Sequence, residues 1–480
     1  MSRLPLARSV LRSPWMAALA LAGCLLAPGS TSTQAVESAG APAAVPTVFP
    51  LSIQPGRRYL QDAAGKPFLL HGDTAWSLIA QLRREEAETY LEDRRRRGFN
   101  TILVNLLEHK FASRAPANAY GERPFLDAGD FAAPNEAYFA HADWVLRRAA
   151  EKGMLVLLAP AYLGYGGGNE GWYAEMTAAG PTKLRAYGEY VGRRYREFTN
   201  ILWVHAGDFD PPRKDLVRAV ADGIRALDQR ALHTAHPAPE TVALDYWAGE
   251  PWLRLGNVYT YKPVYVAALA HYARPERLPF ILLESAYENE HGAGELRLRI
   301  QAYQALLSGA AGQVYGNNPI WRFDGPALHK APMSWRQALD SRGAQSMTHL
   351  RSLFGSLPWW QLEPDTAGTF LTGGTGSGEA RAVAALTADR SLAVVYLPGI
   401  HAVRLDLARM SGPEVAARWF DPASGRFADV AGAPFPATGP QQLRPRALNG
   451  AGQPDWLLLL ESKSQDTAAT RGVPDATRRQ

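Results

Sequence analysis

Short apolar runs alternate with longer amphipathic stretches through the first 350 residues of the chain. Eight of the apolar runs are short enough to be β-strands, and they occupy residues 68–70, 101–105, 155–159, 201–204, 232–234, 257–259, 280–283 and 313–315. Five of the stretches between them carry apolar residues at three- and four-residue spacing, which predicts helices over residues 84–97, 136–152, 182–198, 216–227 and 296–307.

This alternation indicates a parallel α/β domain, and eight strands favour a (β/α)8 TIM barrel over residues 47–358. A doubly wound open sheet is the alternative, but no Gly-x-Gly-x-x-Gly follows the first strand. Beyond residue 360 the pattern changes to short alternating runs at 381–386, 392–397, 402–407, 415–420 and 456–460. These predict a small antiparallel β-sandwich domain over residues 359–462, with a structural role and with Trp419 and Trp456 filling its core or facing the barrel.

The two ends of the chain differ from this pattern. Arg3, Arg8 and Arg12 precede an apolar run at 15–22 that is too short to span a bilayer, which is typical of a signal peptide over residues 1–23. At the other end, residues 463–480 are polar and are expected to form a disordered tail.

The only cysteine stands at the end of the apolar run, in the sequence Leu-Ala-Gly-Cys at 21–24. This resembles a bacterial lipobox, so we expect cleavage before Cys24, lipidation of Cys24, and an exported lipoprotein on a periplasmic or cell-surface membrane. The alternative is a conventional signal that is cut near Ala35, which would leave the protein secreted. Residues 24–46 are rich in Ala, Pro, Ser and Thr, and we expect them to form a flexible or semi-extended tether.

Composition narrows the classes of function. With 46% hydrophobic and 20% charged residues the chain has an ordinary globular composition, and its single cysteine excludes internal disulfides and Cys-rich zinc sites. The net charge of +5 is small, and the basic run at 94–97 lies on a predicted helix, so no nucleic-acid partner is expected. Thirteen Trp and 19 Tyr suit a cleft that binds flat, amphipathic ligands.

Barrel enzymes place their active sites at the carboxyl ends of the strands, so the polar residues after each apolar run are the candidates. Aromatic, amide and acidic side chains gather there, a mixture that saccharide recognition requires because rings stack on sugar C–H surfaces while amides and carboxylates bind hydroxyls. No metal and no cofactor are expected. The predicted substrate-binding residues are Asp73, Trp76, Asn105, Tyr162, Trp172, His236, Tyr261, Tyr315, Asn317 and Trp321.

Asp208 and Glu284 are the candidate catalytic pair, because each directly follows an apolar strand and glycosidic cleavage generally uses two carboxyl groups. One of the two would protonate the leaving oxygen, and the other would act as nucleophile or base. Each has a structural alternative: Asp208 and Asp73 as turn or helix-cap residues, and Glu284 as an acid paired with an arginine.

Several motifs resemble the apiosidase-like glycoside hydrolases. They are His-Gly-Asp-Thr-Ala-Trp at 71–76, Arg-Glu-Glu-Ala at 84–87, Gly-Phe-Asn at 98–100, Pro-Asn-Glu-Ala-Tyr-Phe at 134–139, Asn-Ile-Leu-Trp-Val at 200–204, and Gly-Asp at 207–208. Trp-Phe-Asp-Pro at 419–422 and Asp-Trp at 455–456 resemble the collagen-binding-type β domain that commonly follows this barrel. The resemblance implies a retaining exo-glycosidase acting on plant cell-wall (pectic) glycan side chains, with Asp208 as acid/base and Glu284 as nucleophile. For these roles we expect carboxyl oxygens about 5–5.5 Å apart, a raised pKa on the acid, Asp208, and a nucleophile, Glu284, that stays ionised.

The chain departs from the family pattern at two places near the expected pocket rim. Ala206 stands where the family usually has a second glycine, Phe209-Asp210 replaces Arg-Asn, and residues 259–262 read Tyr-Thr-Tyr-Lys in place of Gln-x-Gly-His. The sugar bound here can therefore differ from apiose. The competing hypothesis is a lipid-anchored carbohydrate-binding protein without catalytic activity, which the presence of both carboxylates disfavours.

Overall fold

The computed structural model describes residues 47–463. The predicted signal peptide, the lipidation site at Cys24, the tether up to residue 46 and the tail from residue 464 lie outside the described residues. Within residues 47–463, no helix combines the length and the apolar character needed to cross a membrane.

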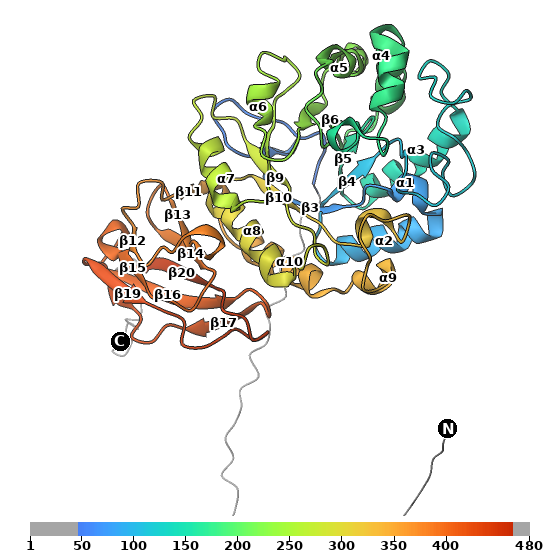
Figure 1. Cartoon of the computed structure of the whole chain (residues 1–480). Coiled ribbons are helices and arrows are strands. Elements are labelled where there is room, and N and C mark those ends of the chain that lie inside the picture. Colours follow the sequence, from blue (N-terminus) through green and yellow to red (C-terminus); the bar gives the residue numbers. More distant parts are fainter. Residues whose placement is uncertain (1–46, 464–480) are drawn as a thin grey trace, which may run out of the picture. The chain divides into compact units, whose positions relative to one another are not determined.

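Eight parallel strands form the first sheet, and helices surround them (Figure 1). The strands are β3 (Leu70–Thr74), β4 (Thr101–Asn105), β5 (Leu155–Ala159), β6 (Ile201–Ala206), β7 (Leu232–His236), β8 (Gly256–Tyr259), β9 (Phe280–Glu284) and β10 (Gly312–Tyr315). Their order is β7-β6-β5-β4-β3-β10-β9-β8. Strands that are consecutive in sequence pair with each other, apart from β7 and β8 at the two ends of this order, and β10 returns to pair with β3. This confirms the predicted eight-stranded barrel.

Side chains close the barrel where β7 meets β8. Asn257 on β8 donates through Nδ2 to Thr234 Oγ1 on β7 (3.0 Å) and to the carbonyl of Ala235. Thr234 Oγ1 in turn donates to the carbonyl of Leu255 at 2.8 Å. These buried bonds replace part of the backbone ladder that the other seven pairs of neighbours have.

The helices between and after the strands are mostly amphipathic. They are α1 (Leu78–Gln81), α2 (Arg84–Arg96), α3 (Glu136–Glu151), α4 (Tyr173–Tyr195), α5 (Lys214–Leu227), α6 (Ala243–Tyr246), α7 (Val264–Tyr272), α8 (Glu295–Leu307), α9 (Trp335–Ala338) and α10 (Arg342–Gly355). The hydroxyl of Ser341 and the side chain of Asn135 cap the first turns of α10 and α3.

Most predicted boundaries differ from the observed ones by a few residues at most, and two differ by four residues or more. The first barrel strand runs over Leu70–Thr74 rather than 68–70, because residues 67–68 instead pair with Leu60–Gln61 in a small hairpin of β1 (Leu60–Gln61) and β2 (Pro67–Phe68). Helix α4 begins at Tyr173 rather than 182. Gly180, at φ +70°, and Pro181 interrupt the helical pattern. Apolar spacing therefore predicted only the part of the helix that follows them.

The second region consists of two antiparallel sheets. The strands are β11 (Leu362–Pro364), β12 (Leu371–Gly373), β13 (Val383–Thr387), β14 (Leu392–Leu397), β15 (Val403–Asp406), β16 (Glu414–Asp421), β17 (Arg426–Asp429), β18 (Phe435–Pro436), β19 (Pro440–Leu443) and β20 (Trp456–Lys463). The larger sheet is ordered β11-β13-β14-β20-β16-β17 with β18 beside β16, and the smaller is β12-β15-β19. One hydrophobic cluster draws residues from both sheets, including the predicted Trp419, and Trp456 packs against it.

Helix α8 joins the barrel to this β domain. Arg299 on α8 is fully buried and donates through Nε and Nη2 to Asp455, at 2.7 and 2.8 Å. Tyr396 on β14 donates to the same carboxylate at 3.0 Å. A buried, bidentate Arg–Asp pair of this kind fixes geometry, and breaking it by removing one partner would leave an uncompensated charge.

Candidate active site

The backbone at the end of β6 turns sharply and carries Asp208 on the turn. Ala206, Gly207 and Asp208 have φ of +66°, +131° and +54°, three successive residues in a region that L side chains rarely adopt. A Cβ on Gly207 would lie 2.4 Å from the ring of Tyr162, so only glycine fits there. Backbone strain that the surrounding structure maintains is characteristic of functional sites.

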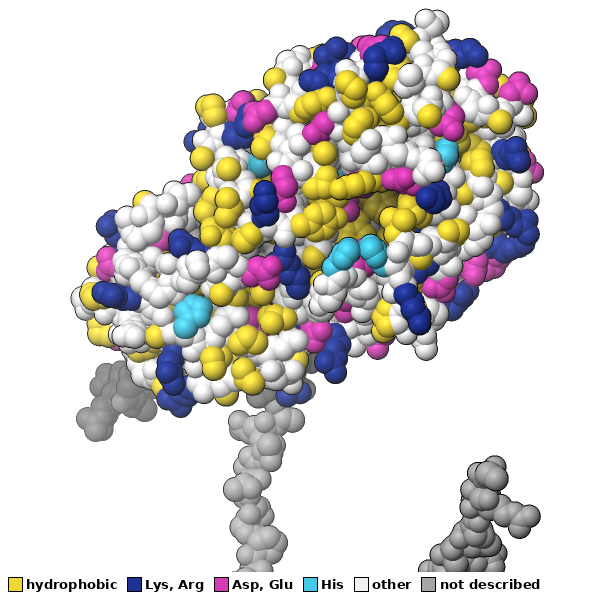
Figure 2. Space-filling view, in the orientation of Figure 1, with side chains coloured by type: hydrophobic (Ala, Val, Ile, Leu, Met, Phe, Trp, Pro, Cys, Tyr) yellow, Lys and Arg dark blue, Asp and Glu magenta, His cyan; other side chains and the backbone are white. Residues whose placement is uncertain are grey.

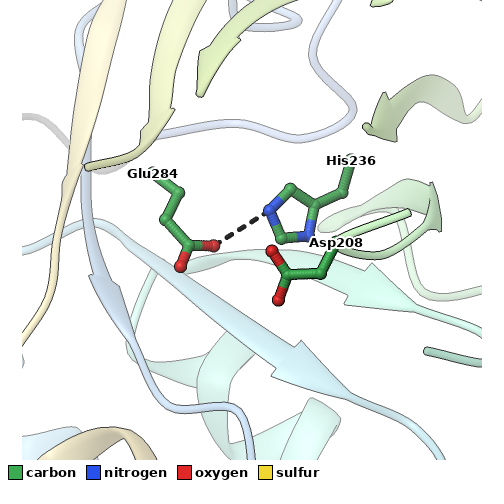
Figure 3. A group of neighbouring side chains, drawn as sticks. All are labelled: Asp208, His236 and Glu284. Carbon is green, nitrogen blue, oxygen red and sulfur yellow. Dashed lines mark ion pairs between the residues drawn. The ribbon is translucent and has the colours of Figure 1, made fainter. Parts of the chain in front are cut away.

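Asp208, His236 and Glu284 meet at the carboxyl ends of β6, β7 and β9 (Figure 3). One oxygen of each carboxylate and one ring nitrogen of His236 all lie within 4.8 Å of one another. His236 Nε2 is 2.9 Å from Glu284 Oε2, an ion-pair contact that is not aligned as a hydrogen bond. Tyr162 donates its hydroxyl to Asp208 Oδ2 at 2.7 Å, whereas Asp208 Oδ1 has no hydrogen-bond partner among the described residues.

Burial and charge shift the protonation of this group. Burial, and then the neighbouring charge of Asp208, raise the pKa of Glu284 to about 7, while His236 acts in the opposite direction. Burial alone would lower the pKa of His236, but contact with Glu284 and the charge of Asp208 outweigh it and raise that pKa above its usual value. A raised pKa on Glu284 was not expected, because the sequence argument predicted that the nucleophile stays ionised. Glu284 is the deeper of the two carboxyls, so it loses more solvation.

A cavity of about 750 Å³ opens over the two carboxylates. Figure 2 shows a hollow on this face, with apolar side chains along its walls and acidic and histidine side chains at its edge. It is lined by Trp76, Asn105, Phe111, Tyr162, Tyr165, Glu170, Asp208, Tyr259, Tyr261, Glu284, Ala286, Tyr287, Glu290, His291, Gly292, Ala293, Arg297, Trp321, Leu328, His329 and Glu379. A volume of this size and a mixed aromatic and acidic lining suit a ligand larger than one monosaccharide.

The aromatic floor of the cavity is held in place by hydrogen bonds and stacking. Trp76 stacks on His236 with ring centroids 5.5 Å apart and an interplanar angle of 17°. Its Nε1 donates to the hydroxyl of Tyr287 at 2.9 Å. Trp321 donates through Nε1 to Glu290 Oε1 at 2.8 Å. Because these rings are fixed before a ligand arrives, little side-chain entropy is lost when a sugar stacks on them.

Seven of the residues predicted from the sequence lie in the cavity wall. They are Trp76, Asn105, Tyr162, Asp208, Tyr261, Glu284 and Trp321. His236 lies behind the wall and acts on Glu284 by direct contact. Each of these lies at the end of a barrel strand or in the loop that follows it, which is why the strand-end rule found them.

Two of the predicted substrate-binding residues are strand residues that point outward. Asp73 lies inside β3 rather than after it, and successive side chains of a strand point to opposite faces of the sheet, so its side chain points toward α2. There Tyr90 donates a hydrogen bond to it at 2.8 Å, and Arg94 lies 3.5 Å away. Tyr315 on β10 likewise points outward and donates to Glu288. Both side chains are buried away from the cavity, so the prediction that they bind substrate was wrong.

Trp172 and Asn317 are also buried outside the cavity wall. Trp172 precedes α4 and packs edge-on against Phe125 and Phe131. Asn317 donates through Nδ2 to Glu288 Oε2 at 2.8 Å. Both serve the packing of loops, so these two substrate-binding predictions were also wrong.

The sequence argument found no three-ligand set for a metal, yet Asp208, His236 and Glu284 have the spacing of one. Two carboxylates and an imidazole are ligands that zinc and iron accept. Here, however, the imidazole already pairs with Glu284 and Tyr162 already bonds Asp208. A metal bound to His236 Nε2 would have to replace its contact with Glu284, whereas Oδ1 of Asp208 could bind a metal without disturbing the bond from Tyr162.

Sequence reasoning missed several cavity residues. Tyr287, three residues after Glu284, belongs to the same strand end as a residue that it did find, and a wider search of that loop would have included it. Tyr165 stands in the glycine-rich loop at 164–171, and the amide of Gly166 donates to the carbonyl of Asp208 at 3.2 Å. Glu379 comes from the β domain, and no pattern in the sequence places it at the barrel.

Comparison with known proteins agrees with this geometry. Residues 54–361 match the family model "Apiosidase-like, catalytic domain", and residues 367–461 match "Putative collagen-binding domain of a collagenase". None of the curated proteins matches the sequence.

Solved structures resemble nearly the whole chain. A structure described as a glycoside hydrolase is 25% identical, covers 87% of this chain and 97% of its own, and superposes with a TM-score of 0.76. A glycoside hydrolase family 5 protein from Bacteroides vulgatus ATCC 8482 is 22% identical, covers 88% of this chain and 95% of its own, and also has a TM-score of 0.76, which shows a common fold. With a family match over well more than half its length, the chain belongs to the apiosidase-like family of glycoside hydrolases.

Proposed function

We propose that this glycoside hydrolase is a retaining enzyme that removes terminal sugars from plant cell-wall (pectic) glycan side chains, with Asp208 as acid/base and Glu284 as nucleophile. The observation that carries the proposal is the short distance between the two carboxylates, since oxygens of Asp208 and Glu284 lie within 4.8 Å of each other. Inverting enzymes need about 6.5–9.5 Å to admit a water, and retaining enzymes need about 5–5.5 Å.

In the first step, the carboxylate of Glu284 attacks the anomeric carbon while the bond from that carbon to the leaving oxygen breaks. The proton on Asp208 passes to the leaving oxygen, so the leaving group departs as a neutral alcohol. Tyr162 occupies Oδ2 of Asp208. Oδ1, which has no hydrogen-bond partner within residues 47–463, is therefore the atom that would carry this proton toward the substrate.

In the second step, the ionised Asp208 takes a proton from a water molecule whose oxygen attacks the anomeric carbon. The ester bond to Glu284 breaks, and the sugar is released with its original anomeric configuration. A protonated His236 beside Glu284 favours the ionised form of that carboxyl, both in the free enzyme and as it leaves.

The test is to identify both the substrate and the stereochemical outcome. The purified protein, with EDTA present to remove metals, is incubated with a panel of 4-nitrophenyl pentosides and with pectic side-chain oligosaccharides. Proton NMR then follows the first-formed anomer. Retention is expected. Release of the opposite anomer would contradict the mechanism, and binding of glycans without cleavage would support the alternative of a carbohydrate-binding protein.

The location of the protein is a separate proposal. We infer from the Leu-Ala-Gly-Cys sequence at 21–24 that lipid on Cys24 anchors the mature protein to a bacterial membrane. The acyl chains would be the anchor, so Cys24→Ser should move the protein from the membrane fraction to the soluble fraction. Equal partitioning of the two proteins would contradict a lipid anchor at this position.

A further inference from the structure

We propose that the β domain takes part in substrate binding, by supplying Glu379 as a binding residue for a sugar unit beyond the one whose bond is cleaved. This inference rests on the proposed function and extends it to the form of the substrate, an oligosaccharide. Glu379 lies in the short helix Gly378–Ala380, between β12 and β13. Among the described residues, it is the one member of the cavity wall that follows β11 in the chain.

The carboxylate of Glu379 forms an ion pair with Arg297 on α8. The Glu379 side chain is 55% exposed, whereas that of Arg297 is only 15% exposed. Arg297 also donates through Nη2 to the backbone carbonyl of Tyr261 at 3.1 Å. Arg297 thus connects the β domain to the loop after β8, and the exposed part of the Glu379 carboxylate is left to face the cavity.

The loop that carries Glu379 is anchored at both ends. Gln304 on α8 is buried and donates through Nε2 to the backbone carbonyls of Glu379 and Arg381, at 3.3 and 3.1 Å. At the start of the loop, Gly374 has φ of +70°, and its backbone packs so closely that a Cβ there would lie 2.0 Å from the carbonyl oxygen of Ala402. These contacts fix the conformation of the loop and hold Glu379 against the barrel, as a binding residue requires.

Tyr261 and Tyr259 connect this region of the cavity to the two catalytic carboxylates. Tyr261 is half exposed, lines the cavity, and lies with its hydroxyl 3.1 Å from that of Tyr259. Tyr259 lines the same cavity as the two carboxylates, and burial, followed by the negative charges of Glu284 and Asp208, raises its pKa. A sugar between Tyr261 and Glu379 would find a ring on which its C–H face stacks and a carboxylate that accepts hydrogen bonds from its hydroxyls.

The cavity volume agrees with this assignment. About 750 Å³ is within the range of pockets that hold drug-sized ligands, which exceed one sugar ring. The two carboxylates need only the ring that carries the scissile bond and the leaving oxygen. The remaining space extends toward Glu379 and Arg297, so it is available to a further sugar of the same chain.

The experiment compares full-length wild type with Glu379→Ala and Glu379→Gln, and with Glu414→Ala as a matched control. Glu414 is an exposed glutamate at the start of β16 and is not part of the cavity wall. For each protein, kcat and KM are measured on a 4-nitrophenyl glycoside that the enzyme cleaves and on size-fractionated pectic oligosaccharides of two to four sugars. Thermal unfolding monitors the fold.

For Glu379→Ala we expect KM on the longer oligosaccharides to rise about 5- to 20-fold, with kcat, KM on the aryl glycoside and the melting temperature close to those of the control. Glu379→Gln keeps one acceptor and should lose less. The inference is overturned if Glu379→Ala matches Glu414→Ala on every chain length. It is also overturned if the loss is equal on aryl and oligosaccharide substrates.

The same variants separate this inference from the proposed function. Equilibrium binding of the oligosaccharide fractions is followed by tryptophan fluorescence for all four proteins. If the wild type binds but cleaves nothing, the proposed function fails, and a weaker Kd for Glu379→Ala than for Glu414→Ala still supports the inference. If the wild type neither binds nor cleaves any fraction, both are overturned.

Discussion

Glu284 and Glu288 are four residues apart, both are buried, and yet their surroundings differ completely. Both oxygens of Glu288 are occupied: Oε1 accepts from the amide of Gly343 at 2.9 Å, and Oε2 accepts from Asn317 at 2.8 Å and from Ser341 at 2.7 Å. Glu284 faces the cavity, and His236 makes its closest charged contact. A carboxylate whose hydrogen bonds are complete supports structure, whereas one with a free oxygen at a cavity remains available to a substrate.

The comparison predicts opposite effects of the same substitution on activity. Glu284→Gln removes the nucleophile, so kcat should fall by about 10⁴-fold or more on every glycoside. Glu288→Gln should reduce kcat per folded molecule by less than about 10-fold, because Glu288 does not face the cavity. Active-site-normalised kinetics check this. If the two variants lose comparable activity, the different surroundings of Glu284 and Glu288 do not distinguish a catalytic from a structural carboxylate.

Asp208 should show a substrate-dependent loss. In Asp208→Ala, we expect activity on unactivated glycosides to fall by about 10²–10⁴-fold, because leaving-group protonation is lost. Aryl glycosides with good leaving groups need little protonation, so they should retain the first step. Azide should then accelerate turnover by replacing water in the second step. An equal loss on both substrate classes without azide rescue would remove Asp208 from the acid/base role.

Stability should respond in the opposite sense to activity. Glu288→Gln places an amide among hydrogen-bond donors and should cost about 2–3 kcal/mol in unfolding free energy. The pKa of Glu284 is raised from 4.5 to about 7 on folding, so the folded state loses stability as pH rises through this window, and Glu284→Gln removes that loss. Glu284→Gln should therefore melt higher than wild type at pH 8 and gain nothing at pH 4. A lower melting temperature at pH 8 would contradict the raised pKa.

The smallest effect concerns the pH profile. The nucleophile must be ionised, so kcat/KM should fall as pH drops below about 7, the pKa of Glu284 in the free enzyme. His236 lowers that pKa, and His236→Asn should therefore move the acidic limb to higher pH. A profile measured for both proteins on one aryl glycoside is sufficient. If the acidic limb of the His236→Asn profile stays in place or moves to lower pH, then His236 does not lower the pKa of Glu284.

The sequence alone predicted much of the fold because apolar runs define the strands of a barrel that is buried on both faces. Strands β4, β5 and β14 have the predicted bounds. The strand-end rule therefore identified Asp208 and Glu284. It failed for Asp73, where the strand extends four residues beyond the predicted end at residue 70 and alternation turns the side chain outward.

Other features of the site depend on distances that no local pattern contains. The deeper burial of Glu284, and hence its raised pKa, follows from how the strands assemble. The place of Glu379 in the cavity wall depends on the contact of α8 with the β domain, through Gln304 and Arg297. Such long-range contacts join segments that are separated by more than 70 residues, so motifs and periodicity do not predict them.

Covalent trapping tests the central assignment most directly. A 2-deoxy-2-fluoro glycoside with a good leaving group, built on the sugar that the enzyme cleaves, slows the second step so that the glycosyl-enzyme accumulates. Mass spectrometry of peptides from the inactivated protein should place the fluorinated sugar on Glu284, and Glu284→Gln should remain unlabelled under the same conditions. A label on any other residue, Asp208 and Glu288 included, would contradict the account.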